Sequence, residues 1–279
     1  MANYTTADIK ALREKTGAGM LDVKKALDEA DGDAEKAIEI IRVKGLKGIA
    51  KREGRSATAG LIAAKVVEDG GSQVGVLVEV NAETDFVAKN EKFIDFAAKV
   101  LDAAIASGAQ TAEELAEAVA DGGSVKELTD SMQAVIGEKI VVRRVARLAA
   151  PRVDTYLHRT NPDLPAQVAV LVGTDEAAAE VAHDIAMHIA AYSPLYLARE
   201  DVPEETVAKE RAIAEETTRA EGKPEKAIPK IVEGRLSGFF KENVLVDQAF
   251  AKDPKTTVGK VVEATGGELT GFVRFRVGA

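Results

Sequence analysis

The 279-residue sequence contains no cysteine, which excludes disulfides, thiolate metal sites and cysteine nucleophiles. It also lacks the basic start and apolar run of a secretory signal, and no stretch approaches the ~20 consecutive apolar residues that span a bilayer. The absence of cysteine fits a reducing compartment. We therefore expect a soluble, cytoplasmic protein that makes no contact with a membrane.

The motifs of nucleotide-binding and catalytic proteins are missing as well. The nearest fragment to a phosphate-binding loop, Gly259-Lys260-Val261, lacks the upstream glycine and the hydroxyl that would hold magnesium. Gly17-Ala18-Gly19 lacks the third glycine of a dinucleotide fingerprint, and we interpret it as a turn. His183 and His188 are five residues apart, so they lie on different faces of a helix and form no helical metal pair.

Carboxylates are plentiful, but they are spread along solvated segments. No pair of them lies in an apolar sequence environment that would give the two carboxyl groups different pKa values. An enzyme that uses an acidic site is therefore a rival that no residue cluster supports. We expect a protein that is not an enzyme, holds no cofactor or metal, and binds no nucleotide by itself.

A formal charge of −9 opposes broad binding to nucleic acid, which depends on lysine and arginine displacing counterions from phosphate. The stretch from Arg42 to Arg55 is the exception. A nucleic-acid-binding protein that uses this stretch is the second rival, and we expect no direct nucleic-acid partner. Gly45, Gly48 and Gly54 interrupt the stretch, which favours a mobile connector over a helix interior.

The sequence predicts two or three folded units, because 46% of its residues are hydrophobic and domains usually contain ~100–200 residues. Residues 1–54 predict a three-helix unit followed by the basic connector. Thr5 or Thr6 can cap the first helix, and Gly17–Gly19 and Asp31–Asp33 separate the helices. Apolar residues at helical spacing would form its core: Ile9, Leu12, Val23, Leu27, Ile38 and Ile41.

The rest of the chain predicts an α+β fold, with core units at 55–146 and 147–279. Leu61–Val67 and Val74–Val80 predict a β-hairpin, followed by a helix around Phe96, a helix from Ser124 to Gly137 and a strand from Ile140 to Val145. A strand at Val168–Val172 and an alanine-rich helix repeat the order weakly, so internal duplication and chance both stay open.

The last third of the sequence adds a second helical unit to this core. Pro203–Gly222 and Pro224–Phe240 predict an antiparallel helical hairpin at about 200–241. A short helix at Thr257–Ala264 and a closing strand at Leu269–Val277 are expected to follow it.

The segment from Thr84 to Asn90 stands out, because Phe86 lies between an acid and a helix start at the exit of a strand. On composition alone, Thr84 would cap a turn and Phe86 would enter the core. Physical reasoning from the residues goes no further at this point.

Two long motifs resemble the elongation factor Ts family: Thr16-Gly17-Ala18-Gly19-Met20-Leu21-Asp22-Val23-Lys24-Lys25-Ala26-Leu27 and Thr84-Asp85-Phe86-Val87-Ala88-Lys89-Asn90. Shorter matches follow in family order: Ile136-Gly137-Glu138, Arg143-Arg144-Val145, Asp184-Ile185-Ala186-Met187-His188, Val232-Glu233-Gly234-Arg235, Thr257-Val258-Gly259 and Gly271-Phe272-Val273-Arg274-Phe275. The similarity covers nearly the whole chain.

The resemblance implies a guanine nucleotide exchange factor that acts on the GTPase elongation factor Tu in translation elongation. It also implies a ubiquitin-associated-like N-terminal domain, a duplicated α+β core and an inserted coiled-coil hairpin. Asp85 and Phe86, with Thr84 and Val87 beside them, would reach the magnesium and phosphate site of the GTPase.

Further partner contacts are carried over from the family in the same way. Leu12, Arg13, Met20 and Leu21 would grip the nucleotide-binding domain, although Leu12 and Leu21 are equally well explained as packing residues. The other implied contacts are Ile136, Gly137 and His158.

Overall fold

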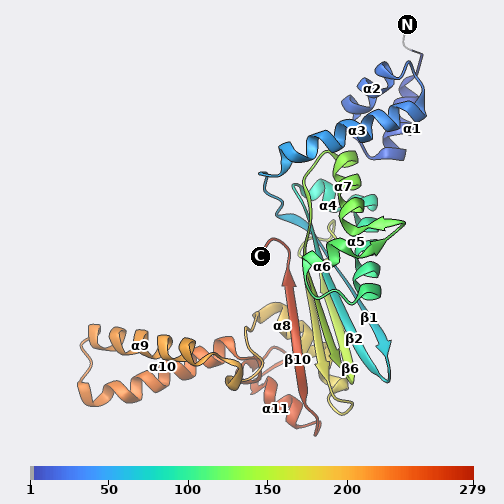
Figure 1. Ribbon diagram of the computed structural model, residues 1–279. Coiled ribbons are helices and arrows are strands. Elements are labelled where there is room, and N and C mark those ends of the chain that lie inside the picture. Colours follow the sequence, from blue (N-terminus) through green and yellow to red (C-terminus); the bar gives the residue numbers. More distant parts are fainter. Residues whose placement is uncertain (1–2) are drawn as a thin grey trace.

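A computed structural model describes residues 3–279 (Figure 1). A helical bundle forms one end of an elongated molecule, sheets and helices form its middle, and a helical hairpin projects from the side (Figure 1). Among these residues, no helix combines the length and apolar character needed to cross a bilayer.

The N-terminal bundle consists of α1 (Thr6–Thr16), α2 (Met20–Glu29) and α3 (Ala34–Arg52). The Thr5 hydroxyl accepts from the Asp8 amide in a capping box, and Asp33 caps α3 by accepting from two backbone amides. The predicted apolar centre is confirmed. Its buried members are Leu12, Val23, Leu27 and Ile41, with Ile9 and Ile38 partly buried against them.

The first sheet contains β1 (Ala59–Asp69), β2 (Ser72–Ala82) and β5 (Ile140–Ala150), all antiparallel, in the order β1-β2-β5. Gly70 and Gly71, with φ of 58° and 92°, form the predicted hairpin turn. The helices that follow β2 are α4 (Asp85–Ala88), α5 (Glu91–Ser107), α6 (Ala112–Glu117) and α7 (Val125–Ile136), and a ribbon of β3 (Val119–Ala120) and β4 (Gly123–Ser124) precedes α7.

The second sheet has the strand order β10-β7-β6, from β6 (Arg152–His158), β7 (Val168–Thr174) and β10 (Leu269–Arg276). In both sheets an antiparallel hairpin precedes a helix, α5 or α8 (Ala179–Tyr192), and a later strand returns beside the second hairpin strand. The α+β fold class is confirmed by this mixture of elements. The internal duplication stays a prediction, which the shared connectivity supports.

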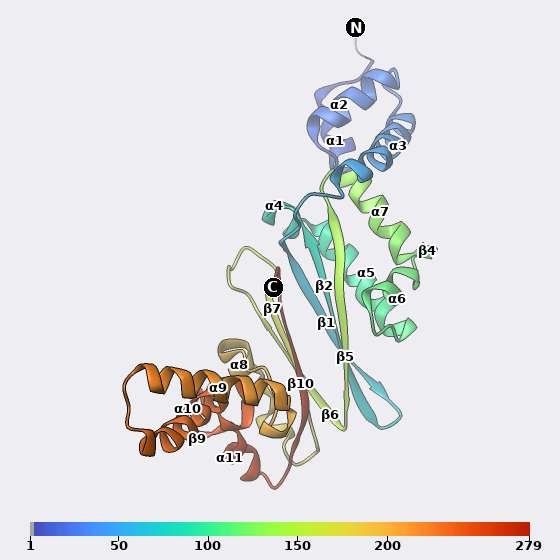
Figure 2. The same ribbon diagram turned by 60° about the vertical axis from the view of Figure 1, so that its left-hand side comes forward.

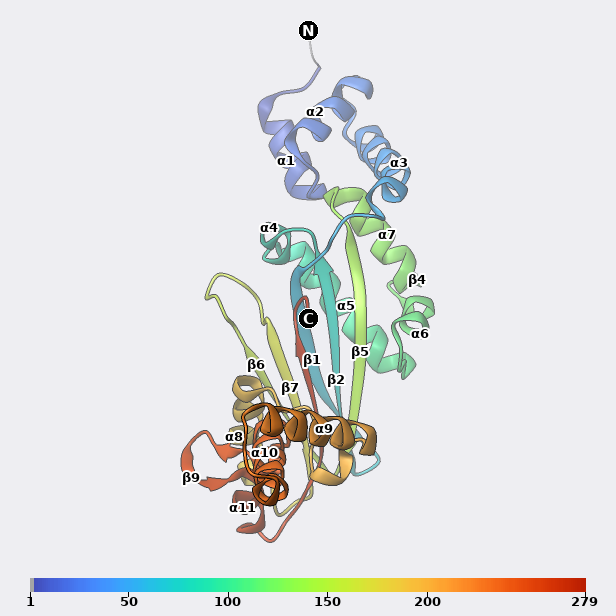
Figure 3. The ribbon, with the colours of Figure 1, turned by 90° about the vertical axis from the view of Figure 1, so that its left-hand side faces the viewer.

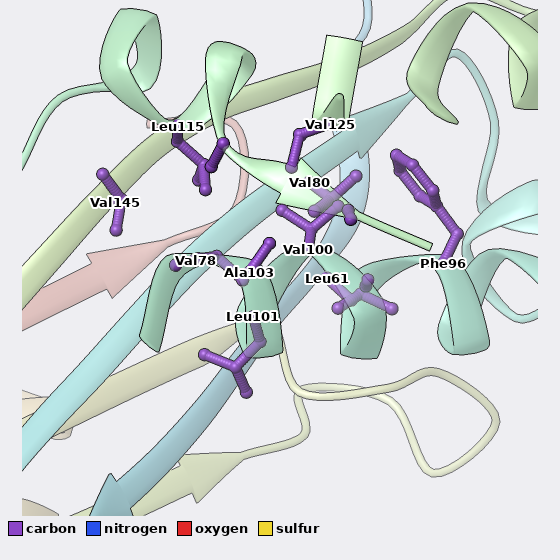
Figure 4. Packing of buried hydrophobic residues seen from close by; sticks show 14 of the residues in the cluster. Leu61, Val78, Val80, Phe96, Val100, Leu101, Ala103, Leu115, Val125 and Val145 are labelled. Atoms are coloured by element: carbon purple, nitrogen blue, oxygen red, sulfur yellow. The ribbon is translucent and has the colours of Figure 1, made fainter. Parts of the chain in front are cut away.

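The two sheets pack face to face between two layers of helices. Val76, Val78 and Val80 of β2 face α5 and α7, where Phe96 and Val100 meet them (Figure 4). Leu77, on the opposite face of β2, packs against the second sheet. Helices α5, α6 and α7 lie on one side of the sheets and α8 lies on the other (Figure 2). Strand β2 is therefore buried on both faces.

A buried carboxylate lies between the two sheets. Glu79 of β2 is 0% exposed, and its Oε2 accepts from Arg144 Nε at 2.6 Å. Its Oε1 accepts from the Gly278 amide at 2.9 Å and from Asn81 Nδ2 at 3.1 Å. The Arg144 guanidinium also lies 4.1 Å from the centre of the Phe275 ring. These contacts join β2 and β5 to the end of β10.

The predicted helical hairpin is present as α9 (Glu204–Ala220) and α10 (Ile228–Asn243). Its apolar stripe consists of Ala214, Ile228, Val232 and Leu236. The turn between the two helices contains η2 (Glu225–Ala227). Around the base of the hairpin lie η1 (Arg199–Asp201), η3 (Leu245–Asp247), β8 (Ala249–Phe250), β9 (Asp253–Thr257) and α11 (Val258–Glu263).

His188 is a core histidine. Its Nδ1 accepts from the Ala251 amide at 3.2 Å, so its Nε2 carries the proton and donates to Gln248 Oε1 at 2.8 Å. Burial lowers the pKa of His188, which keeps the ring neutral. The side chain thus holds α8 to the β8–β9 ribbon.

The predicted mobile connector is wrong, because α3 continues as a helix to Arg52. At Gly45 the helix crosses α7 so closely that a Cβ would lie 2.1 Å from the carbonyl oxygen of Ala134. Arg52 then bridges the two helices by donating to the carbonyls of Gly45 at 2.9 Å and Gln133 at 3.2 Å. A glycine that suggested flexibility is here the condition for close helix packing.

We expect Gly45→Ala to lower the free energy of unfolding by about 1–3 kcal/mol, the usual cost of overfilling a packed contact. Glycine to alanine in a solvated helix has the opposite effect, a gain of ~0.5–1 kcal/mol. Gly238→Ala in α10 is the matched control, since nothing lies within 4 Å of its new Cβ. Urea unfolding of both variants decides the point, and a stabilised Gly45→Ala would contradict the tight crossing.

Candidate partner-binding site

The short helix α4 lies at the upper end of the first sheet (Figure 3), and its Phe86 side chain is exposed to solvent. Thr84 caps α4 as predicted, its hydroxyl accepting from the Val87 amide at 3.4 Å. Val87 and Ala88 are buried, whereas Phe86 is 73% exposed. The expectation from composition that Phe86 enters the core is therefore wrong, because the capped turn directs positions 87 and 88 inward instead.

Charged groups flank the exposed ring. Lys89 Nζ lies 5.0 Å from the centre of the Phe86 ring, within the range of a cation–π contact. Asp85 is exposed, and among residues 3–279 no side chain forms an ion pair with its carboxylate. The turn therefore offers an apolar ring and an unpaired acid side by side.

The turn is attached to the segment that follows α7. Thr84 donates to Glu138 twice, from its amide at 3.0 Å and from its hydroxyl at 2.8 Å. In the reverse direction, the Lys139 amide donates to Glu83 Oε1 at 2.6 Å. We call the four residues Glu83, Thr84, Glu138 and Lys139 the clasp. Gly137, with φ of 81°, ends α7 in the left-handed conformation and turns Glu138 toward Thr84.

The N-terminal bundle places a second apolar surface near α4. Met20 is 58% exposed and Leu21 72% exposed at the start of α2, and Arg13 is also exposed. Leu12, at 4% exposure, lies in the core of the bundle. A Cβ on Gly17 would lie 3.5 Å from the side chain of Lys92, so the α1–α2 turn packs on the start of α5, directly after α4.

The remaining predicted partner contacts, Ile136, Gly137 and His158, come from two different places: the end of α7 and the end of β6. Ile136 is partly buried against the first core, and Gly137 is exposed beside it. His158 is exposed at the end of β6, where its Nδ1 lies 3.2 Å from the Tyr156 hydroxyl. The loop after His158 extends toward the end of the core that carries α4 (Figure 3). No group of acidic and histidine side chains among residues 3–279 has the arrangement of a metal site.

Comparison with known proteins identifies the family whose sequences this chain resembles. The family model described as "Elongation factor TS" matches residues 83–279, from the clasp to the last residue. The chain belongs to the elongation factor Ts family. Over the full length of both chains, it is 69% identical to an elongation factor Ts of Beutenbergia cavernae and 65% identical to that of Micrococcus luteus. That of Renibacterium salmoninarum is 63% identical, also at full length.

The elongation factor Ts motifs noted in the sequence thus include Phe86 and two of the four clasp residues, Thr84 and Glu138. Sequence reasoning missed the roles of Glu83 and Lys139, and it treated Glu138 only as part of a motif. Glu138 follows Thr84 by 54 positions, so no local pattern could reveal their hydrogen bonds. The adjacent ion pair between Arg55 and Glu83, at 3.2 Å, was missed for the same reason.

Proposed function

We propose that this chain is the guanine nucleotide exchange factor of translation elongation, which binds GDP-loaded elongation factor Tu and promotes exchange of GDP for GTP. It catalyses no covalent reaction and acts as a soluble protein of the cytoplasm. The observation that carries the proposal is Phe86, an aromatic ring 73% exposed on a short turn that is hydrogen-bonded at its base.

The exposed ring supplies free energy for inserting the turn into a partner. Burying a phenylalanine side chain contributes about 1.5–3 kcal/mol, and this contribution is available only when the ring leaves water. Asp85, exposed beside it, brings a negative charge to the same place. An inserted ring and acid would stabilise a GTPase conformation in which the magnesium ligands and the phosphate-binding loop are displaced.

Displacement of these loops is sufficient to release GDP. In GTPases of this kind, backbone N–H groups and magnesium hold the phosphates, and both depend on loop geometry. Coupling free energies between two binding sites are reciprocal. If the factor lowers the affinity of the GTPase for nucleotide, nucleotide must therefore lower the affinity of the GTPase for the factor by the same ratio. Entry of GTP would therefore release the factor.

The other candidate residues would provide the grip that precedes insertion. Met20 and Leu21 offer exposed apolar surface and Arg13 an exposed guanidinium. Leu12 would support this surface from inside the bundle. Ile136 and Gly137, next to the clasp, and His158, at the end of β6, would contact the GTPase at further points.

Nucleotide release from elongation factor Tu tests the proposal directly. With a fluorescent GDP analogue on the GTPase, we expect the release rate to rise with factor concentration and then saturate. Calorimetric titration of the isolated chain with GDP or GTP should show no micromolar site, because no phosphate-binding loop is present. A release rate independent of the factor, or a stoichiometric nucleotide site on the chain alone, would refute the function.

A further inference from the structure

The clasp holds the exposed turn from behind. Both oxygens of Glu138 are used on Thr84, one for its amide at 3.0 Å and one for its hydroxyl at 2.8 Å. The same Thr84 hydroxyl accepts from the Val87 amide and so begins α4. One carboxylate therefore fixes the residue that caps the turn carrying Phe86.

The second half of the clasp runs in the opposite direction. Glu83 accepts from the Lys139 amide at 2.6 Å and pairs with Arg55 at 3.2 Å. Lys139 in turn donates from Nζ to the carbonyl of Glu53, just after α3. The exit of β2, the α7–β5 turn and the end of α3 thus meet at the clasp, whose two pairs of consecutive residues are separated by 54 positions between Thr84 and Glu138.

We propose that Glu138 is a positioning residue for exchange, which sets the direction of the Phe86 ring through Thr84. This inference rests on the exchange function proposed above. Glu138 is partly buried and its carboxylate is fully engaged with Thr84, so it is poorly placed to be a contact residue itself. A four-residue helix has too few internal hydrogen bonds to hold its own orientation, and the clasp supplies what it lacks.

The expected signature is a loss of maximal rate without a loss of grip. In Glu138→Ala, misdirection of the ring should lower the saturating rate of GDP release at least about tenfold, since small misplacements of an acting group have large kinetic effects. The concentration for half-maximal release should change by less than about threefold, because the bundle surface of Arg13, Met20 and Leu21 is unaltered.

Two further variants make the test specific. Glu138→Gln keeps one oxygen acceptor for Thr84 and should recover most of the rate, to within about threefold of the parent. Thr84→Val removes both the hydroxyl that Glu138 binds and the cap of α4, so it should lower the saturating rate at least as much as Glu138→Ala does. Glu114→Ala is the matched control. It removes another glutamate that accepts a backbone amide, from Gln110 at 2.7 Å, and should exchange like the parent.

The outcomes separate the inference from the function on which it rests. The positioning role is overturned if Glu138→Ala folds and keeps the parental saturating rate, or if only its half-saturating concentration rises. In that case a defect in Phe86→Ala would still support the exchange function. If Glu138→Ala fails to fold, Thr84→Val decides, because it removes the other partner of the contact: a folded Thr84→Val with the parental saturating rate overturns the positioning role. If the parent protein does not accelerate release, the exchange function itself fails.

Discussion

Replacing Phe86 with alanine is expected to slow factor-catalysed GDP release at least ~30-fold and to leave the thermal midpoint nearly unchanged. An aromatic anchor at an interface typically contributes ~2 kcal/mol or more to binding or coupling. The ring is 73% exposed in the free protein, so its removal takes little from the core. Release of a fluorescent GDP analogue and a thermal melt, made on the same preparation, measure both quantities.

A control and a companion accompany this variant. Val119→Ala trims another exposed apolar side chain, 80% exposed, on the β3–β4 ribbon at the side of the core away from α4, and it should leave exchange unaltered (Figure 3). Asp85→Ala should also weaken exchange, with a stability change of only about 0.3–1 kcal/mol for an acid at a helix start. A collapsed midpoint in Phe86→Ala, or a folded variant with parental exchange, would eliminate the proposed insertion.

The second large effect concerns stability. Arg144→Met is expected to reduce the free energy of unfolding by about 3 kcal/mol, because it removes the only cation paired with a buried carboxylate among residues 3–279; since the Arg144 side chain is itself 34% exposed, the loss should lie at the lower end of the range for buried pairs. That carboxylate belongs to Glu79, which is completely buried between the sheets. Denaturant unfolding measures the loss.

Two comparisons identify the cause. Glu79→Gln combined with Arg144→Met should recover much of the loss, because the neutral amide oxygen can still accept from Gly278 and Asn81. Arg152→Met breaks an exposed pair with Glu176 and should cost no more than about 1 kcal/mol. Equal losses in the single and double variants would show that packing, and not an unpaired charge, is responsible.

Features set by a few neighbouring residues were predictable from the sequence. Ser124 begins α7 in a capping box, and Gly137 ends it in the left-handed conformation, as expected. The glycine pair at 70 and 71 forms the expected hairpin turn. Strand β6 was missed, because only Val153, Tyr156 and Leu157 of its seven residues are apolar, so it lacks the continuous apolar run that marked β1, β2 and β7. Its place is fixed by pairing with β7 along its whole length.

The candidate site was predictable only in part, and the reason is sequence separation. Phe86 by composition belongs in a core, and only its motif suggested otherwise. The packing of α3 on α7 depends on the close approach of Gly45 to Ala134, and the support of Thr84 depends on Glu138. Both contacts join residues far apart in the chain, so local propensity at Gly45 and Thr84 contains no information about them.

The crossing of α3 over α7 has a consequence for how two weak contacts combine. Because Arg52 and the Gly45 contact hold the bundle to the core, we expect the separation between Met20 and Phe86 to vary little. In the proposed mechanism, binding of the bundle would make insertion of the ring an intramolecular step, whose effective concentration would be set by that separation. A rigid connection of the correct length would make this effective concentration high. A flexible connection would lower the effective concentration without altering either contact surface.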